Sequence, residues 1–141
     1  MKNKAPLALM EQLIMLLVFA LAAALCLQVF VYASQVSRQC ETRSNAAEAV
    51  QNAAEITKTC QGNTDLIASY LGGSASPDGW QLFYDADWEA SDTQHASFRV
   101  LIAPEETDSP ALGGARIRAV EGTETLFEIA VYWQEEILEQ R

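Results

Sequence analysis

The chain has 141 residues, half of them hydrophobic, and its 9 basic against 19 acidic side chains give a net charge of −10. This length suits one modest domain with a packed core of its own. The negative charge argues against a nucleic-acid partner, because binding to phosphates needs a basic surface that displaces their counterions.

The apolar residues are concentrated near the N-terminus. The range 13–33 holds 21 residues with one polar member, Gln28, and no charge. A helix of about 20 apolar residues crosses the hydrocarbon core of a bilayer. Lys2 and Lys4 precede this segment, so the positive-inside rule predicts a cytoplasmic N-terminus and an extracytoplasmic C-terminal part. We therefore expect a single-pass protein of the cell membrane.

Two other features of this region bear on that expectation. Residues 34–141 carry 7 basic and 18 acidic side chains, which makes the expected outer domain acidic. A signal peptide cleaved after Ala33 is the alternative to a retained membrane helix. The apolar core of a signal peptide, at 7–15 residues, is shorter than the run found in this chain.

One carboxylate, Glu11, interrupts an apolar stretch that begins at Leu7. A carboxylate facing lipid is costly, so it needs either the membrane interface or a partner. In one interpretation Glu11 and Gln12 lie at the cytoplasmic headgroups, in the first turns of the helix, where the helix dipole favours a negative charge. In the other, Glu11 lies within the membrane and meets a positive group of a neighbouring subunit.

Residues 34–60 contain no proline and no glycine and are rich in alanine. Strong helix formers without a breaker predict that the membrane helix continues outward through Cys60. One face of this helix carries a weak apolar stripe, in which Arg43 and Thr57 fill two of the seven positions. A solvated stalk and a packing surface both remain open. The apolar members of the stripe are Val36, Cys40, Ala47, Val50 and Ala54.

This N-terminal layout resembles that of type IV pilin-like proteins and secretion pseudopilins. The shared features are a short basic leader, a few apolar residues, one glutamate, and a long apolar helix that runs into a polar one. In that family the glutamate is the fifth residue of the mature chain. The resemblance therefore implies cleavage between Pro6, where the family normally has Gly, and Leu7. It also implies an assembly subunit whose partners are other pilin-like subunits or assembly proteins, with Glu11 meeting a partner's positive group.

The chain leaves the long helix at Gly62, which suits the left-handed position after a helix C-terminus. A short second helix is expected over 65–71, with Thr64 or Asp65 as its cap. The stretch 72–79 is rich in glycine, serine, proline and aspartate, and we expect it to be a loop.

The sequence after Gly79 changes to short segments rich in aromatic and branched residues, which are typical of strands. Four strands with short connections predict an antiparallel meander, and the N-terminal helix packed on it completes an α+β domain. The strands are expected over 80–88, 96–103, 115–120 and 125–133. The expected division of the chain is a short cytoplasmic leader over 1–12, a transmembrane helix over 13–33, its extracytoplasmic continuation over 34–60, a short helix and loop over 61–79, the sheet over 80–134 and a polar tail over 135–141.

Asp85, Asp87 and Glu89 alternate along the first predicted strand, so their carboxylates should share one face of it. With Asp92 following, they are a weak candidate for coordinating Ca²⁺, but the spacing and central glycine of an EF-hand are missing. The ordinary alternative is a charged strand that deters unwanted strand pairing. We assign no metal site on this pattern.

Cys40 and Cys60 lie in the expected outer part, where disulfides can form, whereas Cys26 is a small hydrophobe of the apolar run. On one continuous helix Cys40 and Cys60 would be about 30 Å apart at ~1.5 Å per residue, which is too far for a disulfide. Either the helix breaks between them, or they bridge to other chains, or they stay unpaired, and we favour the unpaired state.

No phosphate-binding glycine loop, metalloprotease helix or nucleophile elbow occurs in the sequence, and its one histidine, His95, is expected in a surface turn. We therefore expect no enzymatic activity and no cofactor, and we identify no small-molecule substrate. The rival to an assembly subunit is a membrane-anchored extracytoplasmic binding or sensor module. Such a module would use one or two exposed aromatic side chains as its interaction patch.

Overall fold

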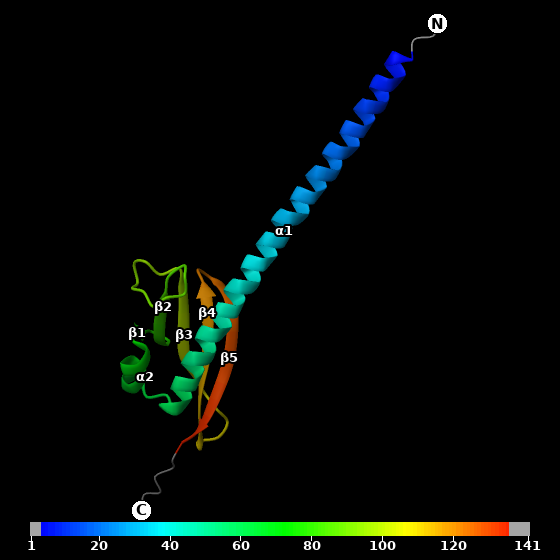
Figure 1. Ribbon diagram of the computed structural model, residues 1–141. Helices are drawn as coiled ribbons and strands as arrows, with labels where there is room; N and C mark the ends of the chain where they lie inside the picture. The colour runs from blue at the N-terminus through cyan, green and yellow to red at the C-terminus, as the bar shows by residue number, and fades with distance from the viewer. Residues whose placement is uncertain (1–3, 136–141) are drawn as a thin grey trace, which may run out of the picture. The chain divides into compact units, whose positions relative to one another are not determined.

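The computed structural model describes residues 4–135 and is an α+β structure with two helices and five antiparallel strands (Figure 1). Contacts divide the chain into two compact units, which meet at the Glu41–Thr42 bond. Apart from Glu135, the predicted tail over 135–141 lies outside the described residues. In chain order the elements are α1 (Ala5–Thr59), α2 (Thr64–Leu71), β1 (Ser74–Ser76), β2 (Gly79–Tyr84), β3 (Phe98–Glu105), β4 (Leu112–Glu121) and β5 (Glu124–Gln134).

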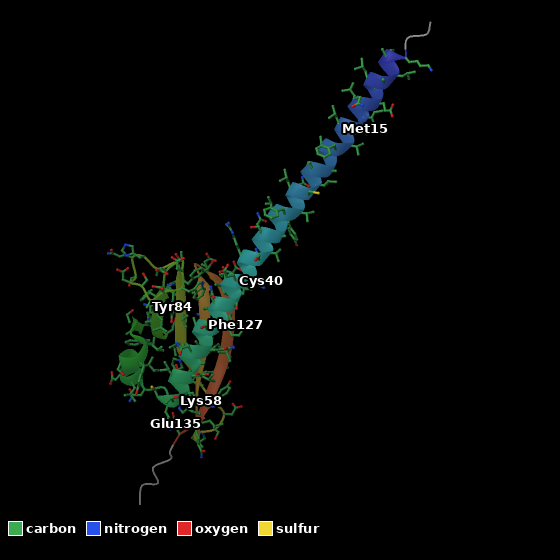
Figure 2. The ribbon with its side chains drawn as sticks, viewed as in Figure 1. Met15, Cys40, Lys58, Tyr84, Phe127 and Glu135 are labelled. Carbon is green, nitrogen blue, oxygen red and sulfur yellow. The ribbon has the colours of Figure 1, made fainter. Side chains whose placement is uncertain are left out.

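The first unit is the N-terminal part of α1, and its apolar side chains are exposed. Pro6 lies in the first turn, where its missing N–H costs no helical hydrogen bond. The large apolar side chains from Leu7 to Tyr32 are 54–74% exposed, and Figure 2 shows those around Met15 projecting from the helix. Within residues 4–135, α1 is the one helix long and apolar enough to cross a membrane. This segment fits a single-pass membrane anchor.

In the second unit, the C-terminal part of α1 lies against one face of the sheet and is the helical layer of the domain (Figure 1). Small side chains let the helix approach the sheet closely. The buried hydroxyl of Thr57 donates to the carbonyl of Ala53 at 2.7 Å, so it is not left unpaired. Between Ala46 and Thr57 this face is therefore a packing surface, whereas Val36 and Cys40 of the predicted stripe are exposed. The buried residues are Ala46, Val50, Ala53, Ala54 and Thr57.

The end of α1 uses two left-handed residues rather than the one that was predicted. Gln61 (φ 50°) and Gly62 (φ 72°) both have positive φ. The N–H of Gly62 donates to the carbonyl of Thr57 at 3.0 Å, and that of Gln61 donates to the carbonyl of Lys58 at 3.1 Å. This is the Schellman arrangement, which satisfies carbonyls that the helix leaves free.

The cap of α2 is Asn63, not Thr64 or Asp65 as predicted. The side-chain oxygen of Asn63 accepts the N–H groups of Asp65 at 3.0 Å and Leu66 at 3.3 Å. Asn63 itself has an extended backbone, as a capping residue requires. Because its side chain satisfies two free N–H groups, α2 begins one residue earlier than expected.

The sheet has the strand order β1-β2-β3-β4-β5, and every neighbouring pair is antiparallel. The predicted meander is therefore confirmed, but the number of strands is five and not four. The missed strand is β1, in which Ser74 pairs with Gln81 and Ser76 with Gly79. Three small residues at a sheet edge are held by their partner strand and carry no hydrophobic pattern of their own.

The two faces of the sheet differ in burial. The face toward α1 carries the apolar core, in which paired side chains such as Ile102 and Ile117 are almost inaccessible to solvent. The other face, called here the outer face, carries the exposed residues that alternate with these along β3 and β4. Buried core residues from the sheet are Leu82, Val100, Ile102, Ala115, Ile117 and Ala119.

Candidate functional site

Glu11 lies nearly two turns into α1, among exposed apolar neighbours. The helix begins at Ala5 and has no acidic residue in its first turn. The helix dipole acts mainly on charges within the first turn, so it does not account for a carboxylate at this position. Among residues 4–135, Glu11 makes no ion pair. Its carboxylate is therefore available to a group outside the described chain.

The predicted processing residues, Pro6 and Leu7, lie in the first turn of α1. Both are exposed, and the N–H of Ala8 donates to the carbonyl of Lys4 at 3.3 Å. The bond between Pro6 and Leu7 is therefore helical. Helix ends open at little cost, so this geometry is compatible with cleavage at the predicted position.

All three cysteines are free in the structure. The helix does not break between Cys40 and Thr59, which removes the one route by which Cys40 and Cys60 could pair within a chain. Cys40 is exposed, and Cys60 is buried next to the end of α1. Within the described chain Cys40 and Cys60 therefore form no disulfide, and of the predicted alternatives the unpaired state and a bridge to another chain remain.

The carboxylates of Asp85, Asp87 and Glu89 do not share a strand face, because β2 ends at Tyr84. Asp85 instead folds the chain back: its Oδ1 accepts the N–H groups of Asp87 at 2.9 Å and Glu89 at 3.0 Å. Short aspartate side chains favour such local bonds over a strand. Within residues 4–135, no three His, Cys, Asp or Glu side chains are placed to hold a metal ion.

Trp88 holds this turn to the core. It has a left-handed backbone, with φ 62°, and its ring stacks on Phe98 with centroids 4.2 Å apart. The ring of Tyr84 is 5.9 Å away, and burial raises the pKa of Tyr84 above its usual value. The strand predicted over 80–88 therefore ends early, at Tyr84, and Trp88 reaches the core from a turn.

His95 lies in an exposed turn, as predicted. Asp92 Oδ1 accepts the backbone N–H groups of Gln94 at 3.2 Å and His95 at 3.0 Å, and it lies 2.8 Å from His95 Nδ1. The hydrogen bond from His95 lowers the pKa of Asp92. Within the described range, the His95 ring bonds to no hydroxyl or thiol, so the structure assembles no acid-base-nucleophile set around it.

A pocket of about 500 Å³ lies between the end of α1, α2 and the β3–β4 connection. Its volume is in the range of small-molecule sites. Trp133 forms part of its wall, and the indole N–H of Trp133 is buried without a hydrogen-bond partner in the described structure. The apolar lining includes Ile67, Trp80, Ile102 and Leu112, and the acidic lining includes Glu105 and Glu135.

Two glycines hold the Trp133 ring in place. A Cβ at Gly62 or at Gly113 would lie 2.7 Å from Cζ2 of this ring, which real side chains do not tolerate. The pocket was not predicted from the sequence, because its residues come from separated segments of the chain. A usable signal was Gly113-Gly114 at the start of a strand, because glycine within a strand often marks the close approach of another group.

The outer face carries an arginine-centred network that was also missed. Arg116 donates to Glu105 and to Glu128, the latter at 2.8 Å. These two hydrogen bonds raise the pKa of Arg116 above its usual value, and the bond that Arg116 donates to Glu105 has the larger effect. Tyr132 adds a hydroxyl 3.3 Å from Glu105. The pairs are exposed, so their contribution to stability is small.

The chain was compared with protein-family models, curated proteins and solved structures, and none of them matches it. The candidate sites therefore rest on their own geometry.

Proposed function

We propose that this chain is a pilin-like or pseudopilin-like assembly subunit of the cell membrane, with a cytoplasmic N-terminus and an acidic α+β domain outside. The observation that carries the proposal is that one helix, α1, supplies both an apolar segment of membrane length and the helical layer of the domain. A tethered domain is ordinarily joined to its anchor by an irregular linker. Here residues 34–59 are helical without interruption.

Glu11 gives this subunit a specific contact. Apart from Gln12, its neighbours along α1 are apolar and exposed, and it has no ion-pair partner among residues 4–135. Because a carboxylate within a membrane is stabilised by pairing, intramembrane charges mark partner sites. We place Glu11 against a positive group of a neighbouring subunit, with the range 13–33 packed against neighbouring helices.

The test is co-purification of two differently tagged full-length copies from membranes. Glu11→Ala is expected to abolish recovery of the second copy, because the paired carboxylate is gone. The matched control is Gln12→Ala, which removes the adjacent polar side chain and should leave recovery unchanged. A simple anchor predicts the opposite pattern: Glu11→Ala would be tolerated and would insert slightly better, and this result would overturn the proposal.

Leader processing is tested separately by the intact mass and N-terminal sequence of the protein from native membranes. A chain that begins at Leu7 supports cleavage after Pro6 and a pilin-like subunit. A chain that begins at Met1 means an uncleaved anchor, and one that begins at Ser34 means a secreted domain without Glu11.

The pocket beside Trp133 favours a second function, a membrane-anchored extracytoplasmic binding module. It combines aromatic and aliphatic walls with the acidic residues Glu106 and Glu135, a mixture typical of ligand sites. A binding module requires the pocket but not Glu11. Glu11→Ala therefore separates the two functions in one experiment.

A further inference from the structure

The pocket of about 500 Å³ beside Trp133 has an apolar interior. Buried side chains of α2, β3 and β4 form part of its wall, since Ile67, Ile102 and Ala115 are each 5% exposed or less. Trp80 adds an aromatic wall. Removal of apolar surface from water is the main source of affinity in pockets of this kind. The interior therefore favours a ligand with an apolar body.

Two carboxyl groups, those of Glu106 and Glu135, lie at the rim of the pocket. Both residues line it, and both are exposed. Neither forms an ion pair with another residue in the range 4–135. The third acidic residue of the lining, Glu105, is held by Arg116 on the outer face of the sheet. Within the described chain, two carboxylates therefore remain for a charged group of a ligand.

Among the described residues, no lysine, arginine or histidine lines this pocket. Lys58 lines a separate hollow between α1 and β5. Arg116 and Arg118 lie on the outer face, where Glu128 forms an ion pair with the first and stands opposite the second in the strand register. The negative charge at the rim is therefore not compensated by the lining, and the pocket attracts a cation.

Hydrogen bonds hold the backbone at both rim carboxylates. The N–H of Glu135 donates to the carbonyl of Ala111 in the β3–β4 connection at 2.9 Å. In the same connection the hydroxyl of Thr107, the residue after Glu106, donates to the carbonyl of Ser109 at 3.0 Å. A rim that is already ordered loses less conformational entropy when a ligand binds. The two segments are therefore in place before a ligand arrives.

The indole N–H of Trp133 contributes no ligand contact in this arrangement. It has no hydrogen-bond partner in the described structure, but it also has almost no accessible surface. The ring lies between Gly62 and Gly113, so an acceptor in the pocket reaches the N–H only if the ring turns. Recognition of a cation by the rim carboxylates needs no such movement.

We propose that this pocket binds a small organic cation, an apolar or aromatic body that carries one ammonium group. The body fills the apolar interior, and the ammonium group stays at the rim beside Glu106 and Glu135. An anion of the same size would be repelled by the two carboxylates. The inference rests on the binding function proposed above for this pocket and names its class of ligand. It does not depend on the assembly function.

The experiment compares three probes of similar size and different charge: phenethylamine, phenethyl alcohol and phenylacetate. Full-length protein in a non-ionic detergent carries fluorotryptophan, and fluorine NMR follows the three indole rings. We expect the amine to shift the signals of Trp80 and Trp133, which line the pocket, and not that of Trp88, which lies in another hollow. The Kd of the amine should be about tenfold lower than that of the alcohol, and phenylacetate should bind most weakly.

Two double variants test the carboxylates. Glu106→Gln with Glu135→Gln removes both charges at nearly unchanged size, so the amine should then bind no better than the alcohol. The matched control is Glu121→Gln with Glu124→Gln, at two exposed positions beside the β4–β5 turn. This turn follows the end of β4 that is remote from the pocket, and the Kd of the amine should not change. Higher salt should weaken binding of the amine but not of the alcohol.

The outcomes separate this inference from the proposed functions. Equal binding of the amine and the alcohol would overturn the cationic ligand and leave the binding function standing. If no probe shifts the signals of Trp80 and Trp133, both the ligand class and the binding function are overturned. If the probes bind only after residues 136–141 are removed, the occupant is the chain's own C-terminal segment, and the proposal is overturned. The assembly function is tested separately by Glu11→Ala.

Discussion

The two parts of α1 are helical for the same local reasons but differ in what covers their side chains. From Leu7 to Tyr32 the large apolar residues are more than half exposed. Between Ala46 and Thr57 the inward residues are small and fully buried. Leucine and phenylalanine suit a lipid surface, while alanine lets a helix approach a sheet. One uninterrupted helix therefore has an exposed apolar part and a buried part, and the size of the apolar side chains distinguishes them.

The difference between the exposed and the buried part of α1 is tested by making the same substitution, alanine to aspartate, in each part. Ala53→Asp places a carboxylate where no surface is exposed and should destabilise the domain by at least about 3 kcal/mol. Ala23→Asp lies on an exposed apolar surface and should leave domain stability unchanged, but it should weaken membrane insertion by roughly 3 kcal/mol. Urea unfolding in detergent, followed by tryptophan fluorescence, reports on the domain, because all three tryptophans lie after Gly79.

Membrane insertion of both variants is measured by resistance to alkaline extraction. Ala53→Asp should insert like the wild type even when its domain is unfolded. If Ala23→Asp destabilised the domain as much as Ala53→Asp does, the two parts of the helix would unfold as one, and the division at Glu41 would be wrong.

A second prediction concerns the C-terminal end of α1, where the Trp133 ring lies between Gly62 and Gly113. Gly113→Ala should lower the free energy of unfolding by about 2 kcal/mol, because the new methyl group collides with this ring. Gly122→Ala is the control: nothing lies within 4 Å of its Cβ position, so only its left-handed backbone opposes the change, at about 1 kcal/mol.

Repeating Gly113→Ala in a Trp133→Leu background tests whether the collision with the indole ring causes this loss of stability. The cost of the glycine substitution should then fall by more than half. An unchanged cost would show that the strand backbone, and not the indole ring, requires glycine at this position.

The long elements of the fold could be predicted because each carries a strong local pattern. The apolar run and the alanine-rich continuation identify α1, and aromatic and branched segments identify β2 to β5. The exact buried face of α1 was harder. Val50, Ala54 and Thr57 of the predicted stripe are buried, whereas Val36 and Cys40 are exposed. Alanines all around the helix weaken the hydrophobic contrast on which such a stripe depends.

The candidate sites were less predictable, because they depend on contacts between distant segments. The strand pattern of Asp85, Asp87 and Glu89 was overridden by the hydrogen bonds of one aspartate. The arginine-centred network and the pocket depend on strand register, which no short motif records. Glu11 could be singled out from sequence because a charge within an apolar run stands out locally, whatever the rest of the fold is.

A third and smaller effect is expected at the connection that follows α1. Asn63→Ala removes the cap of α2 and should lower the free energy of unfolding, measured with urea, by about 1 kcal/mol. Asn52→Ala is the matched control, at an exposed position within α1, where alanine is the better helix former and stability should stay the same or rise slightly. Equal losses from both substitutions would contradict a capping role for Asn63.

The smallest effect belongs to the β2–β3 connection, where local hydrogen bonds replace burial. The bond from His95 lowers the pKa of Asp92, so the ionised carboxylate is favoured in the folded state. The associated stability is present above the unfolded-state pKa of aspartate, about 3.9, and is lost as pH falls through the lower folded value.

An NMR titration of the Asp92 carboxyl carbon should therefore give a midpoint below that of an ordinary aspartate. His95→Ala should raise this midpoint, whereas Thr93→Ala, two residues away, should not. A midpoint that His95→Ala leaves unchanged would mean that the ring does not bond to Asp92 in solution, and the turn would then rest on the two backbone N–H groups that Asp92 accepts.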